Sequence, residues 1–204
     1  MITLEQLREC TGAELDNAAR YLEPLNKAME WAEINTPRRM AAFLATIAVE
    51  SGNLRATEEG LHYRSADRLA KIFPRVFPDS ESAAACVANP AALSEKLYGG
   101  FHGRGLIQLT WERNYRACGQ DLGIDLVENP GLLTQPAGAA LSAAWFWKEN
   151  NCNTPADAGD MDKVTRIVNG PAKLHLAERI QFYVKALQVL ESATPAPASE
   201  PQES

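Results

Sequence analysis

Apolar residues recur at helical spacing in the segment PRRMAAFLATIAVES, which begins at Pro37. One face of this segment is apolar, and it consists of Met40, Phe43, Leu44 and Ile47. Thr36 suits the N-cap position and Pro37 the first helical position, while Ser51 and Gly52 are typical of a helix end. The pattern therefore predicts a helix from Pro37 to about Ser51.

Similar patterns predict helices along most of the chain. They cover residues 15–29, 66–73, 111–118, 136–149, 160–169 and 174–190. No strand-like alternation is sustained, which leaves room for at most a small hairpin near residues 54–64 or 101–109. We expect an all-α fold forming a single domain over residues 1–191. Residues 192–204 are rich in Pro, Ala, Ser and Glu and are expected to be disordered.

Composition narrows the classes of function. The chain has 204 residues, enough for one well-buried domain, and its formal net charge is -6. This charge, without any basic stripe, argues against nucleic acid as a partner. No run approaches the roughly 18 apolar residues of a membrane helix, so we expect no membrane insertion. The charged start, MITLEQLREC, predicts synthesis in the cytoplasm without a signal peptide.

The cysteines and histidines do not indicate a metal centre. The four cysteines form no CxxC pair, and the three histidines have no metal-motif spacing. We therefore expect no metal and no cofactor. Reduced, partly buried thiols are one interpretation of the cysteines. The alternative is a Cys118–Cys152 disulfide, which would matter if the protein works outside the cytosol.

Two sets of carboxylates lie in contrasting contexts. Glu50 falls at the end of the apolar face of the central helix, where partial burial would disfavour its charged form, as a general acid requires. Glu58 and Glu59 follow in a polar segment with Gly60. Carboxyl groups in contrasting environments are typical of divided acid and base roles.

A second unusual stretch is FHGRGLIQLT, residues 101–110. Alternation from Leu106 to Thr110 predicts a short extended piece that places Gln108 and Thr110 on one side. We expect Thr110 also to cap the helix that follows. The alternative is a glycine-rich turn. A phosphate loop is a poor interpretation, because the Lys-Ser/Thr pair is missing.

These segments together resemble one family. AVESGNL, EEGLHY, GRGLIQLT, AAWFW, VTRIVNG and ERIQFY occur in one order. The set resembles the plant-type chitinases of glycoside hydrolase family 19, and most closely their bacteriophage or prophage endolysin branch. The resemblance covers nearly the whole chain to about Leu190. It implies a glycoside hydrolase with a lysozyme-like, two-lobed fold and a substrate cleft.

The resemblance also implies roles for the acidic residues. Glu50 matches the general acid of the family, and Glu59 matches the base that activates water. Glu58 is the rival for the base role. Family members of this kind invert the anomeric configuration, which requires carboxyl groups ~6.5–9.5 Å apart so that a water fits between them and the sugar.

Further roles carry over by position. Thr110 matches a hydroxyl residue that helps to hold the nucleophilic water. Arg179 matches an arginine that organises the catalytic carboxylates, and a guanidinium there could hold a base such as Glu59 ionised; the alternative is a surface ion pair. The residues matched to substrate contacts are Gln108, Asn114 and Asn169, with Arg104 and Tyr63 either lining or supporting the cleft.

The chain departs from the family pattern in several places. Val49 stands where a histidine is usual, and Gly52-Asn53 replaces a Gly-Gly pair. The loop before Gly103 is shortened to GGFH, which makes the distal sugar subsites uncertain. The disulfide pattern of the plant enzymes is missing.

Two substrates fit this chemistry. The first is peptidoglycan, whose β-1,4-linked glycan strands an endolysin cleaves to lyse the bacterial cell after release by a holin or a secretion machine. The second is chitin, and a secreted antibacterial effector with the same chemistry is a variant of the first. A catalytically silent wall-binding module is disfavoured because both Glu50 and Glu59 are present. We expect a monomer.

Overall fold

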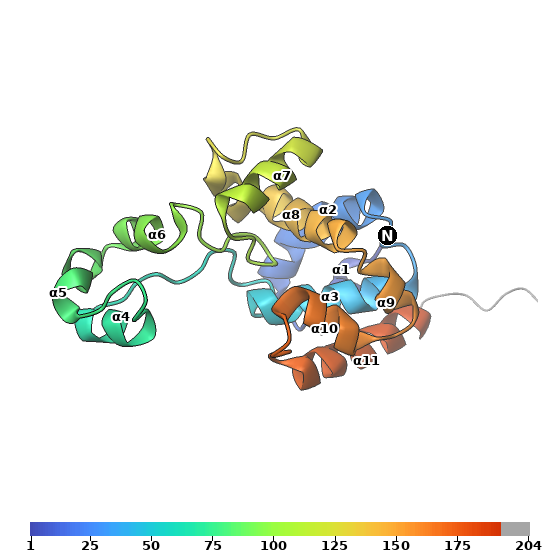
Figure 1. Cartoon of the computed structure of the whole chain (residues 1–204). Coiled ribbons are helices and arrows are strands. Elements are labelled where there is room, and N and C mark those ends of the chain that lie inside the picture. The colour runs from blue at the N-terminus through green and yellow to red at the C-terminus, as the bar shows by residue number, and fades with distance from the viewer. Residues whose placement is uncertain (193–204) are drawn as a thin grey trace, which may run out of the picture.

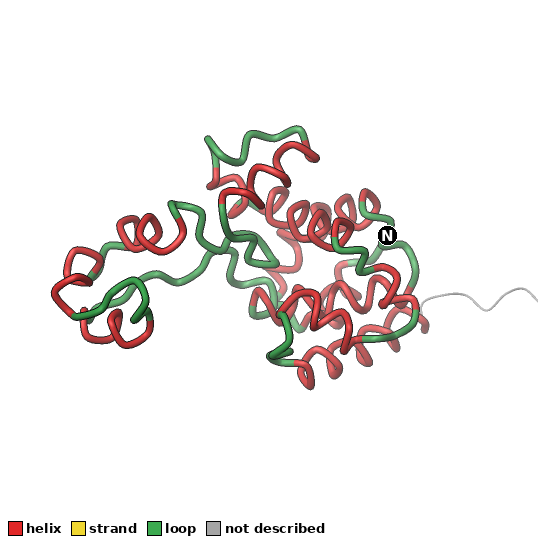
Figure 2. Tube along the Cα trace, in the orientation of Figure 1, coloured by secondary structure: helices red, strands yellow, loops and turns green. Residues whose placement is uncertain are grey.

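The computed structural model describes residues 1–192, whose regular secondary structure consists of helices joined by loops and turns (Figures 1 and 2). The predicted disordered tail lies, from residue 193 onward, outside the described residues. No named strand occurs within residues 1–192. The helices are α1 (Leu4–Thr11), α2 (Leu15–Trp31), α3 (Pro37–Ser51), α4 (Ala66–Ile72), α5 (Ser80–Ala83), η1 (Ala84–Cys86), α6 (Pro90–Tyr98), α7 (Glu112–Leu122), η2 (Pro130–Thr134), α8 (Pro136–Glu149), α9 (Asn153–Asp157), α10 (Met161–Asn169) and α11 (Leu176–Ser192).

Helix α3 is the central element of the larger part of the molecule. Its ends are as predicted: the Thr36 side chain accepts a hydrogen bond from the Arg39 amide, and Gly52 follows in the left-handed conformation. Every residue from 41 to 48 is buried, because α1, α9, α10 and α11 all pack against this helix. The helix is therefore buried around its whole circumference for most of its length.

A separate, smaller lobe is formed by residues 61–98. Its helices α4, α5, η1 and α6 enclose a hydrophobic cluster of their own. That cluster contains Leu61, Leu69, Phe77, Ala83, Cys86 and Leu93. In Figure 1 this small lobe stands apart from the remaining helices, which form the large lobe. Two connecting segments, residues 54–60 and 99–104, join the lobes, and the predicted mostly helical, two-lobed fold is confirmed.

The connecting segments pair with each other without forming a hairpin. An isolated antiparallel bridge joins Glu58 to Arg104. The Glu59 amide donates to the Gly103 carbonyl at 2.8 Å, and the Gly105 amide donates to the Thr57 carbonyl at 2.8 Å. Of the two places where a small hairpin was expected, residues 54–64 form none and pair instead with a distant part of the chain. Within residues 101–109, an isolated antiparallel bridge joins Arg104 to Leu109.

The prediction of an extended piece from Leu106 to Thr110 is wrong. Arg104 and Leu109 exchange backbone hydrogen bonds of 3.0 and 2.7 Å, and the residues between them form a turn. The turn requires positive φ angles at Gly105 (82°) and Gln108 (57°), which a continuous strand does not have. The glycine-rich turn, the alternative interpretation, is the one the structure adopts.

Thr110 does not cap the following helix. Trp111 occupies the N-cap position of α7, with a φ of 77° and no side-chain capping bond. The Thr110 hydroxyl instead donates to the Gln108 carbonyl at 2.9 Å. The local sequence favoured Thr110 as a cap, but the turn directs its side chain backward along the chain.

All four cysteines are free and buried, so the alternative of a Cys118–Cys152 disulfide is wrong. The two thiols lie in different hydrophobic clusters: Cys118, a residue of α7, packs in a cluster with Tyr115 and Trp145, and Cys152 lies in the main core. Burial raises the pKa of both thiols to about 12. Both therefore stay protonated and behave as small apolar groups.

None of the helices described within residues 1–192 is long and apolar enough to cross a membrane.

The contact between α8 and η2 generates a stability prediction. A Cβ added at Gly138 would lie 2.1 Å from the Leu132 carbonyl oxygen, a backbone atom. Alanine gains about 1 kcal/mol of helix propensity over glycine, but overpacking against backbone costs about 1–3 kcal/mol. We expect Gly138→Ala to be destabilising overall in thermal unfolding. Gly131→Ala, in η2 with open space at its Cβ, is the control and should change stability by less than about 0.5 kcal/mol.

Candidate active site

Glu50 lies in the last turn of α3 and is held by residues from two other helices. Arg179 of α11 donates from Nη2 to the Glu50 carboxylate. Asn169, the last residue of α10, donates from Nδ2 to the same oxygen at 3.1 Å. The Glu50 side chain is 16% exposed, so the carboxyl group is largely enclosed but open on one side.

Arg179 is a buried residue and contacts the acid candidate. Its side chain is 0% exposed, so the alternative of a surface ion pair is wrong. Nη1 donates to the Thr46 carbonyl of α3 at 3.4 Å, while Nε has no partner within the described residues. A buried guanidinium needs a counter-charge. Among the described residues its ion pair is with Glu50 and not with Glu59.

Glu59 projects from the first connecting segment and is held from the second connecting segment and from α6. The Tyr98 hydroxyl donates to Glu59 Oε1 at 2.8 Å, and the Gly103 amide donates to Oε2 at 3.3 Å. Burial and the bond to Glu59 raise the pKa of Tyr98 well above its usual value. The phenol therefore stays protonated and remains a donor to this carboxylate.

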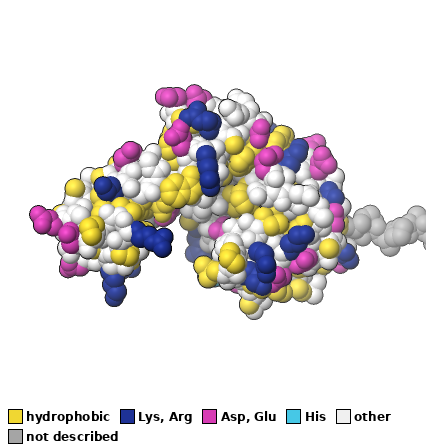
Figure 3. Space-filling model, viewed as in Figure 1, with side chains coloured by type: hydrophobic (Ala, Val, Ile, Leu, Met, Phe, Trp, Pro, Cys, Tyr) yellow, Lys and Arg dark blue, Asp and Glu magenta, His cyan; other side chains and the backbone are white. Residues whose placement is uncertain are grey.

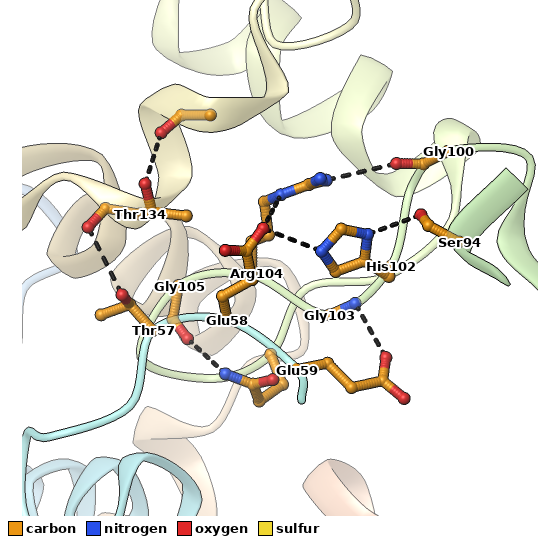
Figure 4. A network of polar contacts seen from close by, with 12 residues as sticks. Thr57, Glu58, Glu59, Ser94, Gly100, His102, Gly103, Arg104, Gly105 and Thr134 are labelled. Atoms are coloured by element: carbon orange, nitrogen blue, oxygen red, sulfur yellow. Dashed lines mark hydrogen bonds and ion pairs between the residues drawn. The ribbon is translucent and has the colours of Figure 1, made fainter. Parts of the chain in front are cut away.

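Glu58 points away from Glu59 and is tied into a different network (Figure 4). His102 Nε2 lies 2.9 Å and Arg104 Nε 3.0 Å from Glu58 Oε1. Partial burial opposes the charge of Glu58, but the hydrogen bonds from His102 and Arg104 outweigh it and lower the pKa of this carboxyl group. Glu58 is thus engaged as a structural anion, and Glu59 is the one of the two carboxylates that has no cationic partner within residues 1–192.

The network around Glu58 extends to the small lobe and to α7. Ser94 of α6 lies 2.6 Å from His102 Nδ1, and the buried Arg104 also donates to the Tyr115 hydroxyl at 3.1 Å. Arg104 therefore supports the site, although it also borders the pocket beside Glu59. Sequence reasoning missed Ser94, Tyr98 and Tyr115 as members of the site. The available signal was weak: Ser94 and Tyr98 are four residues apart and so share one face of α6.

Three predicted residues form a chain of hydrogen bonds across the turn at residues 105–108. The side chains of Gln108, Thr110 and Asn114 donate to the carbonyls of Gly105, Gln108 and Thr110, at 3.0, 2.9 and 2.8 Å. All three side chains are partly exposed. Because the Thr110 hydroxyl donates its hydrogen, its oxygen can still accept a hydrogen bond from a water.

The turn lies close to Glu59. A Cβ built on Gly103 would meet Gln108 Oε1 at 2.9 Å and the Glu59 Cβ at 3.5 Å. Gly103 therefore allows the base candidate and the polar turn to approach each other. A pocket of about 460 Å³ opens beside Glu59, between the connecting segments and α6. Tyr63 lies further along, in a neighbouring pocket, with its ring edge-on to Phe73.

Comparison with known proteins identifies the family. The family model for chitinase class I, glycoside hydrolase family 19, matches residues 31–184. The chain belongs to glycoside hydrolase family 19. It is 29% identical over 184 residues to a glycosyl hydrolase family 19 domain-containing protein of Haemophilus influenzae, covering 83% of this chain and 88% of the relative. The predicted class of enzyme, a glycoside hydrolase, is confirmed.

The chain is also similar to plant and bacterial chitinases. Acidic endochitinase SP2 of Beta vulgaris is 30% identical over 185 residues, which cover 86% of this chain but 58% of that protein. The structure of chitinase C from Streptomyces griseus superimposes with a TM-score of 0.63 at 24% identity, covering 96% of this chain and 78% of the other. The class IV chitinase of Zea mays gives a TM-score of 0.57 at 21% identity, covering 95% and 92%. These structures share the fold of this family 19 chain.

The Glu50–Arg179 pair leads to a prediction on stability. Removing one partner of a buried ion pair costs about 3–5 kcal/mol, because the other charge is left uncompensated. Glu50 is partly exposed, so we expect Glu50→Gln and Arg179→Met each to cost about 2–4 kcal/mol in chemical denaturation. The double variant should cost about 1–3 kcal/mol less than the sum.

The matched control is the more exposed ion pair between Arg39 and Asp157, with exposures of 23% and 43%. Asp157→Asn should cost about 1 kcal/mol or less. Additive costs in the Glu50 and Arg179 cycle would show that the two side chains are not energetically coupled.

Proposed function

We propose that this family 19 chain hydrolyses β-1,4 bonds between N-acetylated amino sugars by an inverting mechanism, with Glu50 as the general acid and Glu59 as the general base. The observation that carries this proposal is that the two carboxyl groups have different contacts and surroundings. Glu50 is enclosed by the large lobe and touches Arg179 and Asn169. Glu59, on the first connecting segment, faces the pocket between the connecting segments and α6.

The contacts of Glu50 suit an acid that becomes charged during the reaction. Glu50 forms the ion pair as a carboxylate, so it takes up a proton from solvent before it acts as the acid. When it gives this proton to the leaving sugar oxygen, the negative charge returns to the carboxylate. The Arg179 guanidinium is already in place to stabilise that charge, and it needs no rearrangement to do so. Asn169 adds a second donor to the same oxygen. The proton donor and its stabilising groups thus come from one rigid set of helices, α3, α10 and α11.

The contacts of Glu59 suit a base that receives a proton from water. Tyr98 and the Gly103 amide both donate to Glu59, and these bonds fix the direction of its carboxylate. We assign Thr110 to the attacking water, since its oxygen retains accepting capacity beside the same turn. We assign Gln108 and Asn114 to the sugar through their amide groups, with Asn169 contributing from the end of α10. An inverting reaction needs the two carboxyl groups ~6.5–9.5 Å apart, with room for a water between them.

For the substrate we propose peptidoglycan, and for the biological role an endolysin that degrades the bacterial wall after a holin or a secretion machine releases it. The bacterial relative that this chain matches over most of its length supports a bacterial setting. The basic surface of the small lobe, described below, supports an anionic glycan. Chitin is the second candidate, because relatives such as the Beta vulgaris protein are named endochitinases.

The substrate proposal predicts release of muropeptides from purified sacculi. Reducing ends should appear with time, and mass spectrometry of the products should show which amino sugar carries the new reducing end. The parallel assay uses chito-oligosaccharides and colloidal chitin. Faster cleavage of chitin with no product from sacculi would replace the endolysin role with that of a chitinase.

The acid and base assignments predict a distinct order of variants. Glu50→Gln and Glu59→Gln should each lower kcat by about 100-fold or more, since general acid–base catalysis contributes about 10²–10⁴. Glu58→Gln is the neighbouring control and should keep kcat within about tenfold, because Glu58 is occupied by His102 and Arg104. Circular dichroism at the assay temperature verifies that each variant is folded. If Glu58→Gln were the more damaging of the adjacent pair, the base would be Glu58.

A further inference from the structure

The segment that follows Glu59 has the opposite charge to the chain as a whole. Residues 60–75 contain Arg64, Arg68, Lys71 and Arg75 but a single acidic residue, Asp67, whereas the chain carries a net charge of -6. In Figure 3, some of the Lys and Arg atoms of the small lobe border the hollow between the lobes, and others lie on its outer surface. The positive charge is thus concentrated beside the proposed cleavage site.

These cations lack acidic partners in the part of the chain that the structure describes. None of the four basic side chains forms an ion pair within residues 1–192, although Arg39, Arg104, Arg116 and Arg179 all do. Asp67 is engaged elsewhere, since it accepts a hydrogen bond from Ser80 of α5. Unpaired surface cations are common, so their number alone identifies no site. The arrangement of two of them around a pocket is more specific.

Arg64 and Arg68 line a pocket of about 490 Å³, together with Gly60, His62, Tyr63 and Ser65. We call it the arginine pocket. It begins at Gly60, the residue next to Glu59, and His62 borders both this pocket and the one beside Glu59. The Tyr63 ring is braced edge-on against Phe73, with ring centres 5.9 Å apart. A ligand in the arginine pocket would therefore lie against the Tyr63 ring and next to the pocket beside Glu59.

The chemistry of the pocket selects carboxylates. Guanidinium groups bind carboxylates through paired hydrogen bonds, and two of them around one pocket attract an anion strongly. Chitin is a neutral polymer of N-acetylglucosamine. Peptidoglycan has the same β-1,4 backbone, but every second sugar bears a lactyl group that carries a carboxylate or a stem peptide with carboxylates. An anionic substituent near the cleaved bond is what distinguishes the two substrates.

We propose that the arginine pocket binds a carboxylate of the peptidoglycan strand and so gives this site a preference for peptidoglycan over chitin. This inference rests on the proposed glycosidase function of Glu50 and Glu59. The shared chemistry is a carboxylate close to the glycan chain, from either the lactyl group or the stem peptide. Neither the acid nor the base takes part in this recognition, so it can be removed without disabling the reaction.

The test compares the double variant Arg64→Gln/Arg68→Gln with the wild type on three substrates. These are native sacculi, sacculi whose carboxyl groups have been coupled to ethanolamine, and chito-oligosaccharides. The matched control is Lys71→Gln/Arg75→Gln, which removes the same charge from the same segment outside the pocket. All four side chains are exposed, so both variants are expected to fold.

We expect the double variant to lose roughly three- to tenfold in kcat/KM on native sacculi, the range that two exposed charge contacts supply. Its activity on blocked sacculi and on chito-oligosaccharides should equal that of the wild type, and the control pair should lose less than twofold on every substrate. Wild-type activity on blocked sacculi should fall to the level of the double variant. Amidase-treated strands keep only the lactyl carboxylate and therefore show which carboxylate is bound. If the double variant is still slower than the wild type on these strands, the pocket binds the lactyl group. If the two proteins are equally active, it binds the stem peptide.

Equal activity of the double variant and the wild type on native sacculi would show that the arginine pocket does not bind a peptidoglycan carboxylate, and it would leave the proposed function intact. A matching loss in the control pair, or an equal loss on chito-oligosaccharides, would do the same. By contrast, a wild type that cleaves chito-oligosaccharides but releases nothing from sacculi would overturn peptidoglycan as the substrate, and the pocket's role with it. A wild type that cleaves neither would overturn the function itself.

Discussion

The ion pair between Glu50 and Arg179 is the interaction on which the large lobe and the candidate site both depend. It joins residues 129 positions apart, at the end of α3 and the start of α11. The guanidinium is fully buried and its Nε lacks a partner within the described residues, so the Glu50 carboxylate is its main compensation. A buried charge is costly unless it is paired. The residue proposed to give a proton to the sugar therefore also neutralises the core of its own lobe, which ties catalysis to stability.

The second carboxylate is positioned by quite different means. Glu59 lies on a connecting segment with almost no regular structure, and its direction is set by Tyr98 from the small lobe and by the Gly103 amide. Ser94 and Tyr98 of α6 reach the two neighbouring acids separately, Ser94 through His102 to Glu58 and Tyr98 directly to Glu59. Because each lobe has its own hydrophobic cluster, the placement of the small lobe sets where the base stands relative to the acid.

The structure departs from the predicted local structure at residues 106–110, next to the segments that connect the two lobes. The extended piece at residues 106–110 is a turn because Gly105 and Gln108 both take positive φ angles and the Gly105 amide bonds to Thr57 in the other connecting segment. Thr110 loses its capping role for the same reason, since the turn leaves Trp111 to start α7. Tertiary contacts between the connecting segments thus override the local preference of residues 106–110 for a strand and of Thr110 for the N-cap position.

The sequence by itself determined the helical class, the span and the ends of α3, and the position of Glu50 at the end of its apolar face, because these features depend on spacing and capping within a few residues. It also pointed to Glu59, through resemblance to a family. Only the tertiary structure decided that Arg179 serves Glu50, that Glu58 is held by His102 and Arg104, and that Arg64 and Arg68 border one pocket with Gly60. The contacts of Glu50 and Glu58 join segments that are distant in the chain, and the arginine pocket is a space enclosed by several side chains. A local pattern of residue types does not specify which side chains come into contact in the folded protein.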